Sequence, residues 1–116
     1  MSLKKKFDET YATYTRHGWQ LVRVLARPET LKELGGDAGA RYEGAPLSES
    51  DVDAMWFTRA SQGGREAWEL RLVADTPYAL FELFEPDESE EDRDDVRREM
   101  EAKLRDYVSP RDEQGH

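Results

Sequence analysis

The segment from residue 54 to residue 85 constrains the fold of this chain most strongly. Aromatic and aliphatic residues gather in three short stretches, which are separated by a glycine pair and by an Asp-Thr-Pro-Tyr sequence. Glycine pairs and Asp/Pro-containing tetrapeptides are typical of the turns between consecutive strands. The sequence therefore predicts a β-meander over Ala54–Glu85, with strands at Ala54–Ala60, Glu66–Ala74 and Ala79–Glu85.

The register of this meander follows from its turns. A two-residue turn at the glycine pair sets Phe57 opposite Leu70, and a four-residue second turn sets Leu70 opposite Leu83. In this register one face of the sheet is almost wholly apolar: Met55, Phe57, Trp68, Leu70, Leu72, Ala74, Ala79, Phe81 and Leu83. The other face is mixed, with Arg71 between Trp56 and Glu82, where it can form a cation–π contact and an ion pair.

Two amphipathic helices flank the meander. Leu3–His17 carries an apolar stripe at helical spacing, and Gly18 follows as a typical C-terminal cap. Asp87–Val108 begins with a run of acidic residues, which the positive end of a helix dipole favours, and it ends before Pro110. Its apolar stripe consists of Val96, Met100, Leu104, Tyr107 and Val108.

The region between the first helix and the meander is less regular. The sequence predicts a strand at Trp19–Ala26, although a helix that runs on to Pro28 is the alternative. A short helical turn follows through Leu34, and residues 35–51 form a long surface loop rich in Gly, Ala, Ser and Pro. Within that loop, residues 48–52 could open a helix instead, because Ser50 and Asp53 fit a capping box.

Together these elements predict one two-layer α+β domain over residues 1–110, followed by a flexible C-terminal tail at 111–116. We expect an antiparallel sheet of about four strands, with the N- and C-terminal amphipathic helices packed on the same face. The mixed face of the sheet would then be the outer face.

The charge of the chain is a weak guide to its role. It has 26 acidic and 17 basic residues, a net charge of −9. Most of that excess falls in the last predicted helix and the tail, where helix electrostatics accounts for the clustering. Net negative charge disfavours nucleic acid or an anionic membrane as the partner, and mimicry of nucleic acid is an alternative. With no apolar stretch of membrane-spanning length, we expect a cytoplasmic protein.

Residues for catalysis or metal binding are few. The chain has no cysteine, and its histidines, His17 and His116, stand far apart. The acidic run at 87–95 lacks the spacing and the glycine of a calcium-binding loop. We therefore expect no cofactor, no metal and no catalytic residue. Glu82 is the one carboxylate expected in mid-sheet, and pairing with Arg71 would oppose any rise of its pKa.

The mixed outer face is the strongest functional signal, because aromatic residues and arginine are typical interface anchors. We expect a non-enzymatic interaction module that binds a protein partner or a second copy of itself through Trp56, Arg71, Leu80, Glu82 and Phe84. The alternative is a small ligand-binding protein or enzyme, with a pocket between the sheet and loop 35–51 lined by Tyr42, Trp56, Arg71 and Glu82. A helix or loop that covers Trp56 and Phe84 would remove the interface argument.

Overall fold

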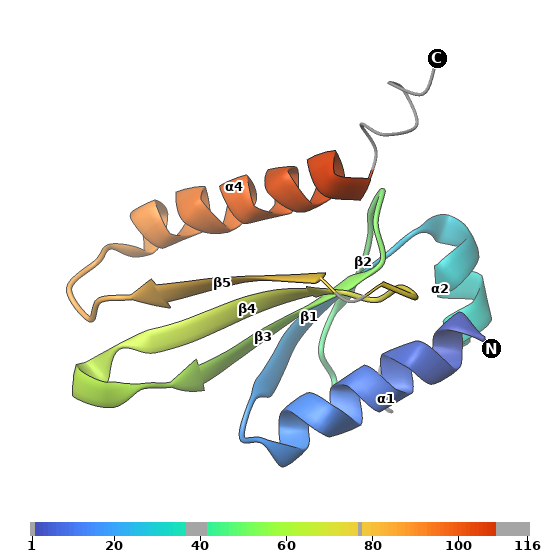
Figure 1. Ribbon diagram of the computed structural model, residues 1–116, viewed down its shortest axis with the longest axis horizontal. Helices are drawn as coiled ribbons and strands as arrows, with labels where there is room; N and C mark the ends of the chain where they lie inside the picture. Colours follow the sequence, from blue (N-terminus) through green and yellow to red (C-terminus); the bar gives the residue numbers. More distant parts are fainter. Residues whose placement is uncertain (1, 37–41, 77, 109–116) are drawn as a thin grey trace.

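Three α-helices and one five-stranded sheet make up the part of the chain that a computed structural model describes, residues 2–36, 42–76 and 78–108 (Figure 1). The predicted α+β class is confirmed. The helices are α1 (Leu3–Arg16), α2 (Pro28–Leu34) and α4 (Glu90–Val108). The strands are β1 (Gln20–Ala26), β2 (Leu47–Glu49), β3 (Ala54–Ala60), β4 (Glu66–Leu72) and β5 (Tyr78–Phe84).

The strands lie in the order β2-β1-β3-β4-β5. All neighbours are antiparallel except β1 and β2, which run parallel. The predicted strand at Trp19–Ala26 and the predicted meander are thus present. Strand β2, three residues inside the expected loop, was not predicted, and the alternative of a helix at 48–52 is wrong. A single leucine between a proline and two polar residues is too short a pattern to indicate a strand.

The first turn of the meander is one residue longer than predicted. Gln62–Gly64 forms it, with positive φ at both glycines, and the Ser61 N–H donates to the Arg65 carbonyl (2.9 Å). As a result Phe57 lies opposite Glu69, not Leu70. A shift of one residue moves every side chain of a strand to the opposite face, so the predicted β3–β4 register is wrong.

The second turn is also longer, because Leu72 pairs with Tyr78 and Leu70 lies opposite Leu80. This shift is again an odd number of residues. Because both shifts are odd, they cancel between β3 and β5. Side chains of these two strands that were predicted to share a face of the sheet therefore do share one. Only β4 is turned over, so Leu70 and Leu72 join Trp56 on one face while Arg71 joins the other.

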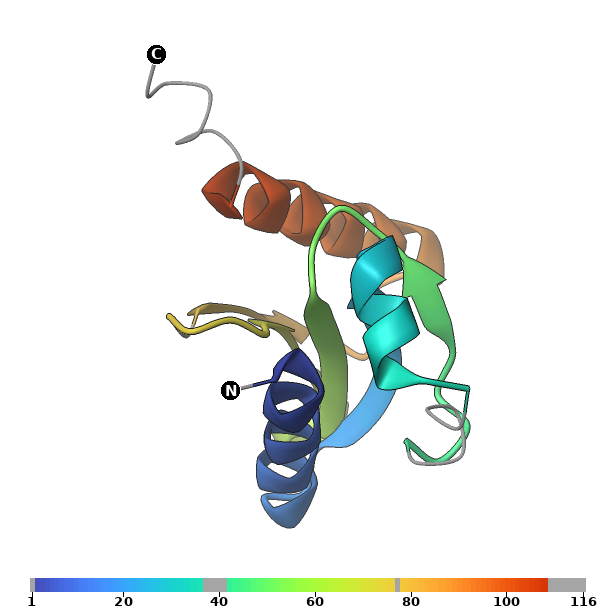
Figure 2. The same ribbon diagram turned by 90° about the vertical axis from the view of Figure 1, so that its right-hand side faces the viewer.

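The terminal helices pack on opposite faces of the sheet, which corrects the predicted two-layer arrangement (Figure 1 and Figure 2). α1 and α2 cover a cluster that includes Phe7, Val24 and Phe57, whereas α4 covers a cluster that includes Trp56 and Leu70. The central strands β1 and β3 carry apolar side chains on both sides, so each face needs its own cover. The result is a three-layer structure.

Local signals set the ends of the helices much as predicted. The Ser2 hydroxyl accepts the Lys5 N–H at the start of α1, and Gly18 follows its end with φ of +87°. α4 begins later than predicted, because the Ser89 hydroxyl accepts the Asp92 N–H and caps the helix. The predicted tail at 111–116 lies outside the described residues. No helix in the described ranges is long and apolar enough to cross a membrane.

Candidate interaction surface

Strand β5 differs sharply between its two faces. Its side chains alternate, so that Tyr78, Leu80, Glu82 and Phe84 point toward α4 and the intervening residues point to the α1 side. Phe84 is 1% exposed, whereas Phe81 is 57% exposed and Leu83 is 37% exposed. One strand therefore contributes both to the core and to an apolar surface.

Helix α4 covers the first of these faces. The Arg97 guanidinium lies 4.5 Å from the centre of the Trp68 ring and 5.8 Å from that of Phe84. The Trp56 Nε1–H donates to Glu101 on the same helix (2.8 Å). Burial lowers the pKa of Arg97, but its ion pairs with Asp94 and Glu90 outweigh that effect and raise it, so the guanidinium stays charged over the rings.

Helix α1 does not cover the second face in the same way. It packs against β1 and α2, and its Tyr14 stacks on Phe57 of β3 with ring centres 4.1 Å apart. Beyond that contact the helix reaches β4 through a hydrogen bond from the Tyr14 hydroxyl to Glu69. The α1-side face of β5 lies further out and stays open, with Ala79, Phe81 and Leu83 exposed on it.

The border of this open face is polar. Glu69 and Arg71 of β4 lie opposite Phe81 and Ala79, and the Arg71 guanidinium lies 6.0 Å from the centre of the Tyr14 ring. Burial and the hydrogen bond to Glu69 raise the pKa of Tyr14 to about 12, despite the opposing effect of Arg71. The hydroxyl is therefore a hydrogen-bond donor at neutral pH. This hydrogen bond connects α1 to Glu69 of β4, next to the exposed face of β5.

The outer edge of β5 also presents backbone groups that pair with no other strand of the described chain. Ser61 and Arg65 form a hydrogen-bonded pair, so the odd-numbered residues of β4 bond to β3 and the even-numbered ones bond to β5. Even residues of β4 lie opposite even residues of β5. The N–H and C=O groups of Ala79, Phe81 and Leu83 therefore point away from the sheet, where no strand of the described chain pairs with them.

The predicted interface residues do not form one exposed surface. Trp56, Leu80, Glu82 and Phe84 share a face, as predicted, but α4 covers it, and Trp56 and Phe84 are 3% and 1% exposed. Arg71 lies on the opposite face, because β4 is turned over. Phe81, which the predicted register assigns to the core, is instead the most exposed large apolar residue of the described chain. The lengths of the two turns explain the position of Arg71, whereas Phe81 keeps its predicted face and is exposed because α1 does not reach β5 there.

The predicted pocket beside loop 35–51 is not assembled either. Tyr42 is buried in the α1-side cluster, and its hydroxyl donates to Asp8 (2.7 Å). Trp56 and Glu82 belong to the α4 side, across the sheet from it. Residues 37–41 of the loop lie outside the described chain.

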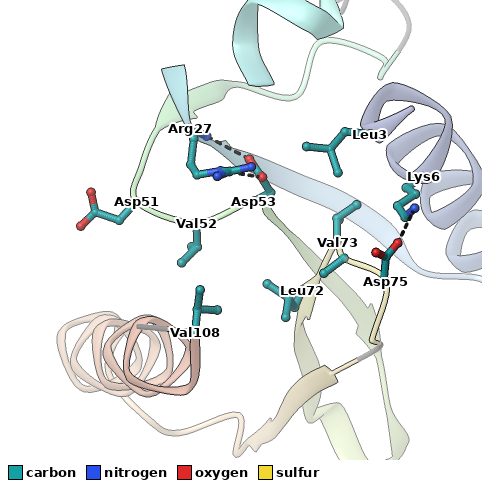
Figure 3. A pocket seen from close by; sticks show the side chains of 11 residues that line it. Leu3, Lys6, Arg27, Asp51, Val52, Asp53, Leu72, Val73, Asp75 and Val108 are labelled. Atoms are coloured by element: carbon teal, nitrogen blue, oxygen red, sulfur yellow. Dashed lines mark hydrogen bonds and ion pairs between the residues drawn. The ribbon is translucent and has the colours of Figure 1, made fainter. Parts of the chain in front are cut away.

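A different hollow, of about 430 Å³, opens at one end of the sheet between α1 and α4 (Figure 3). Its walls are largely apolar, with Val52, Leu72 and Val73 at the base. The Arg27 Nε–H donates to the buried Asp53 carboxylate (2.9 Å) inside it. At its rim Lys6 pairs with Asp75 (2.8 Å), which keeps the pKa of that carboxyl below its usual value. Both cations of the hollow thus face carboxylates of the same hollow, and these pairs join its walls.

No group of three or more acidic or histidine side chains in the described residues is arranged to hold a metal ion. A comparison with family models, curated proteins and solved structures finds no match for this chain. Inferences about its role therefore rest on its own geometry, in which the open edge and face of β5 are the most unusual feature.

Proposed function

We propose that this protein is a non-enzymatic interaction module, and that its binding element is the open edge of β5, which takes up an extended polypeptide strand. One observation carries the proposal. The outer strand of the sheet presents outward-pointing backbone groups together with two exposed large apolar side chains, Phe81 and Leu83. Strand addition uses both kinds of contact, because backbone bonds supply affinity and alternate side chains supply specificity.

The composition of β5 supports this proposal. Natural edge strands are usually short or carry lysine, proline or bulges, which prevent pairing with other chains. β5 is seven residues long, and Glu82 is its single charged residue. The preferred partner strand has apolar side chains at alternate positions, which would pack beside Phe81 and Leu83.

Site-specific photo-crosslinking tests the proposal even though the partner is unidentified. A benzophenone amino acid replaces Phe81 in one variant and Val108 in the other, expressed in cells that make the protein natively. Val108 is the matched control, because it is also an exposed large apolar residue (38%) but lies at the end of α4. We expect covalent polypeptide adducts from position 81 and few from position 108. Equal yields at both positions would contradict the proposal.

A further inference from the structure

Strand β5 is complementary to a second copy of itself. We infer that the partner strand is β5 of another molecule of this protein, paired antiparallel about a two-fold axis at Phe81. The inference rests on the proposed function and identifies the partner of the same site. It follows from the backbone, from the side chains and from the charges of the strand.

The backbone selects this register. Ala79, Phe81 and Leu83 point their N–H and C=O groups outward, and they are spaced evenly about Phe81. A two-fold axis at Phe81 sets Ala79 opposite Leu83 of the second copy and Phe81 opposite its own counterpart. All three outward residues then form hydrogen-bonded pairs. A shift of the register by two residues loses one of these hydrogen-bonded pairs. A shift by one residue places residues whose N–H and C=O groups point outward opposite residues whose groups point into their own sheet.

The side chains match in the same register. On the α1 side, the two Phe81 rings become neighbours and each Ala79 lies beside a Leu83, so three exposed residues find apolar partners. On the α4 side, Glu82 lies opposite Leu80 of the second copy and not opposite a second glutamate. Tyr78 lies opposite Phe84. No cross-strand pair of like charges arises within β5, although the chain as a whole is strongly acidic.

The carboxylates nearest to each end of β5 have a cation beside them, whereas Asp87, further along the chain, has no ion pair among the described residues. Asp75, before the strand, pairs with Lys6 (2.8 Å), and Glu85, after it, pairs with Arg65 (3.0 Å). An antiparallel arrangement would bring Asp75 of one copy toward Glu85 of the other. Because each carboxylate has a cation beside it, the repulsion between them is reduced. The two five-stranded sheets would join into one continuous sheet, with both α4 helices on one face.

Cysteine crosslinking tests this register, and the natural absence of cysteine makes the background low. Ala79→Cys and Leu83→Cys are prepared as separate chains with tags of different size, and are oxidised alone and as a mixture. In the inferred register the Cα atoms of residues 79 and 83 are about 5.5 Å apart, within disulfide range. Residue 79 and its own counterpart are about 14 Å apart, because they are displaced by four residues along the strand as well as across the pair, and this is too far to bridge.

We therefore expect a disulfide-linked dimer of differently tagged chains in the mixture, in at least tenfold excess over either variant alone. Val108→Cys, mixed with either variant, is the matched control. Sedimentation of the wild type should show twice the mass of one chain at high concentration, and Phe81→Asp should sediment as one chain. Circular dichroism checks that each variant is folded.

Three results would overturn the inference. Crosslinking of Ala79→Cys with itself as readily as with Leu83→Cys would contradict the register, and so would a dimer that no cysteine pair traps. A wild-type chain that sediments as a monomer at every concentration would exclude a second copy as the partner. In that case, photo-crosslinks from position 81 to another protein would leave the proposed function intact, and their absence would remove it too.

Discussion

The two edges of the sheet are built differently, and so are the two faces of its outer strand. At one edge, β2 has only three residues and directly follows Pro46. Short edge strands and prolines are both features that limit pairing with other chains. At the other edge β5 has seven residues, with Phe84 buried beneath α4 and Phe81 exposed on the opposite face. The same residue type on the same strand thus contributes to stability at one position and to a surface at the other.

The largest expected effect concerns the covered face. Phe84→Ala should lower the free energy of unfolding by about 3–5 kcal/mol, because it leaves a cavity beside Trp68 and below Arg93 and Arg97. Urea denaturation measured by tryptophan fluorescence gives this value. A loss below about 1 kcal/mol would show that α4 does not bury Phe84. The difference in burial between Phe84 and Phe81 would then not hold.

The second prediction tests how α4 is held in place. Arg97→Met should lower the free energy of unfolding by about 1–2 kcal/mol, because it removes the charge over Trp68 and Phe84 while keeping much of the side chain. Arg98→Met is the matched control. The Arg98 side chain is 70% exposed and its ion pair with Asp95 lies in solvent, so we expect almost no change. If both variants lost the same free energy of unfolding, the effect would come from the net charge of α4 and not from the contact of Arg97 with the two rings.

The third prediction concerns the polar border of the open face. Tyr14→Phe should cost about 1 kcal/mol at neutral pH, since it removes the hydrogen bond to Glu69. Folding raises the pKa of Tyr14 from 10.0 to about 12, so its contribution is complete below pH 10 and is lost as the pH rises toward 12. The stability difference between wild type and variant should therefore shrink over this window. A difference that stays constant from pH 9 to pH 12 would contradict the assignment.

The smallest expected change in stability belongs to the open face. Phe81→Ala should alter the free energy of unfolding by no more than about 0.5 kcal/mol when measured on dilute, monomeric protein. At high concentration the wild type should gain stability over the variant, because assembly stabilises the folded state by mass action. Denaturation midpoints measured over a hundredfold range of concentration separate the two contributions. A large loss in dilute solution would place Phe81 in the core.

Much of the fold could be predicted from local patterns. The glycine after α1, the proline at the start of α2 and the apolar stripes of α1 and α4 identify the helices, although α4 begins three residues later than predicted, at Glu90 and not Asp87. The same holds for β1 and the three strands of the meander. These signals act over a few residues, and hydrogen-bonded caps and turns realise them without help from distant parts of the chain.

The interaction surface could not be predicted in the same way. The five residues assigned to it share only part of a face, since Arg71 is turned away from Trp56 and Phe84. The error arose from both turns: Gln62 joins the two glycines and lengthens the first loop by one residue, and the second loop is also longer than predicted. Both turn lengths are compatible with glycine, and each gives a largely apolar face, so hydrophobic pattern alone does not choose between them.

The sequence by itself determined the class of this protein, the positions of its helices and main strands, and the alternation of side chains along β5. Only the tertiary structure decided which face α4 covers, and therefore that Phe84 is buried while Phe81 is exposed. The physical reason is the range of the forces involved. Caps, turns and periodicity act between neighbouring residues, whereas the cover of a sheet depends on contacts between elements that are far apart in the sequence.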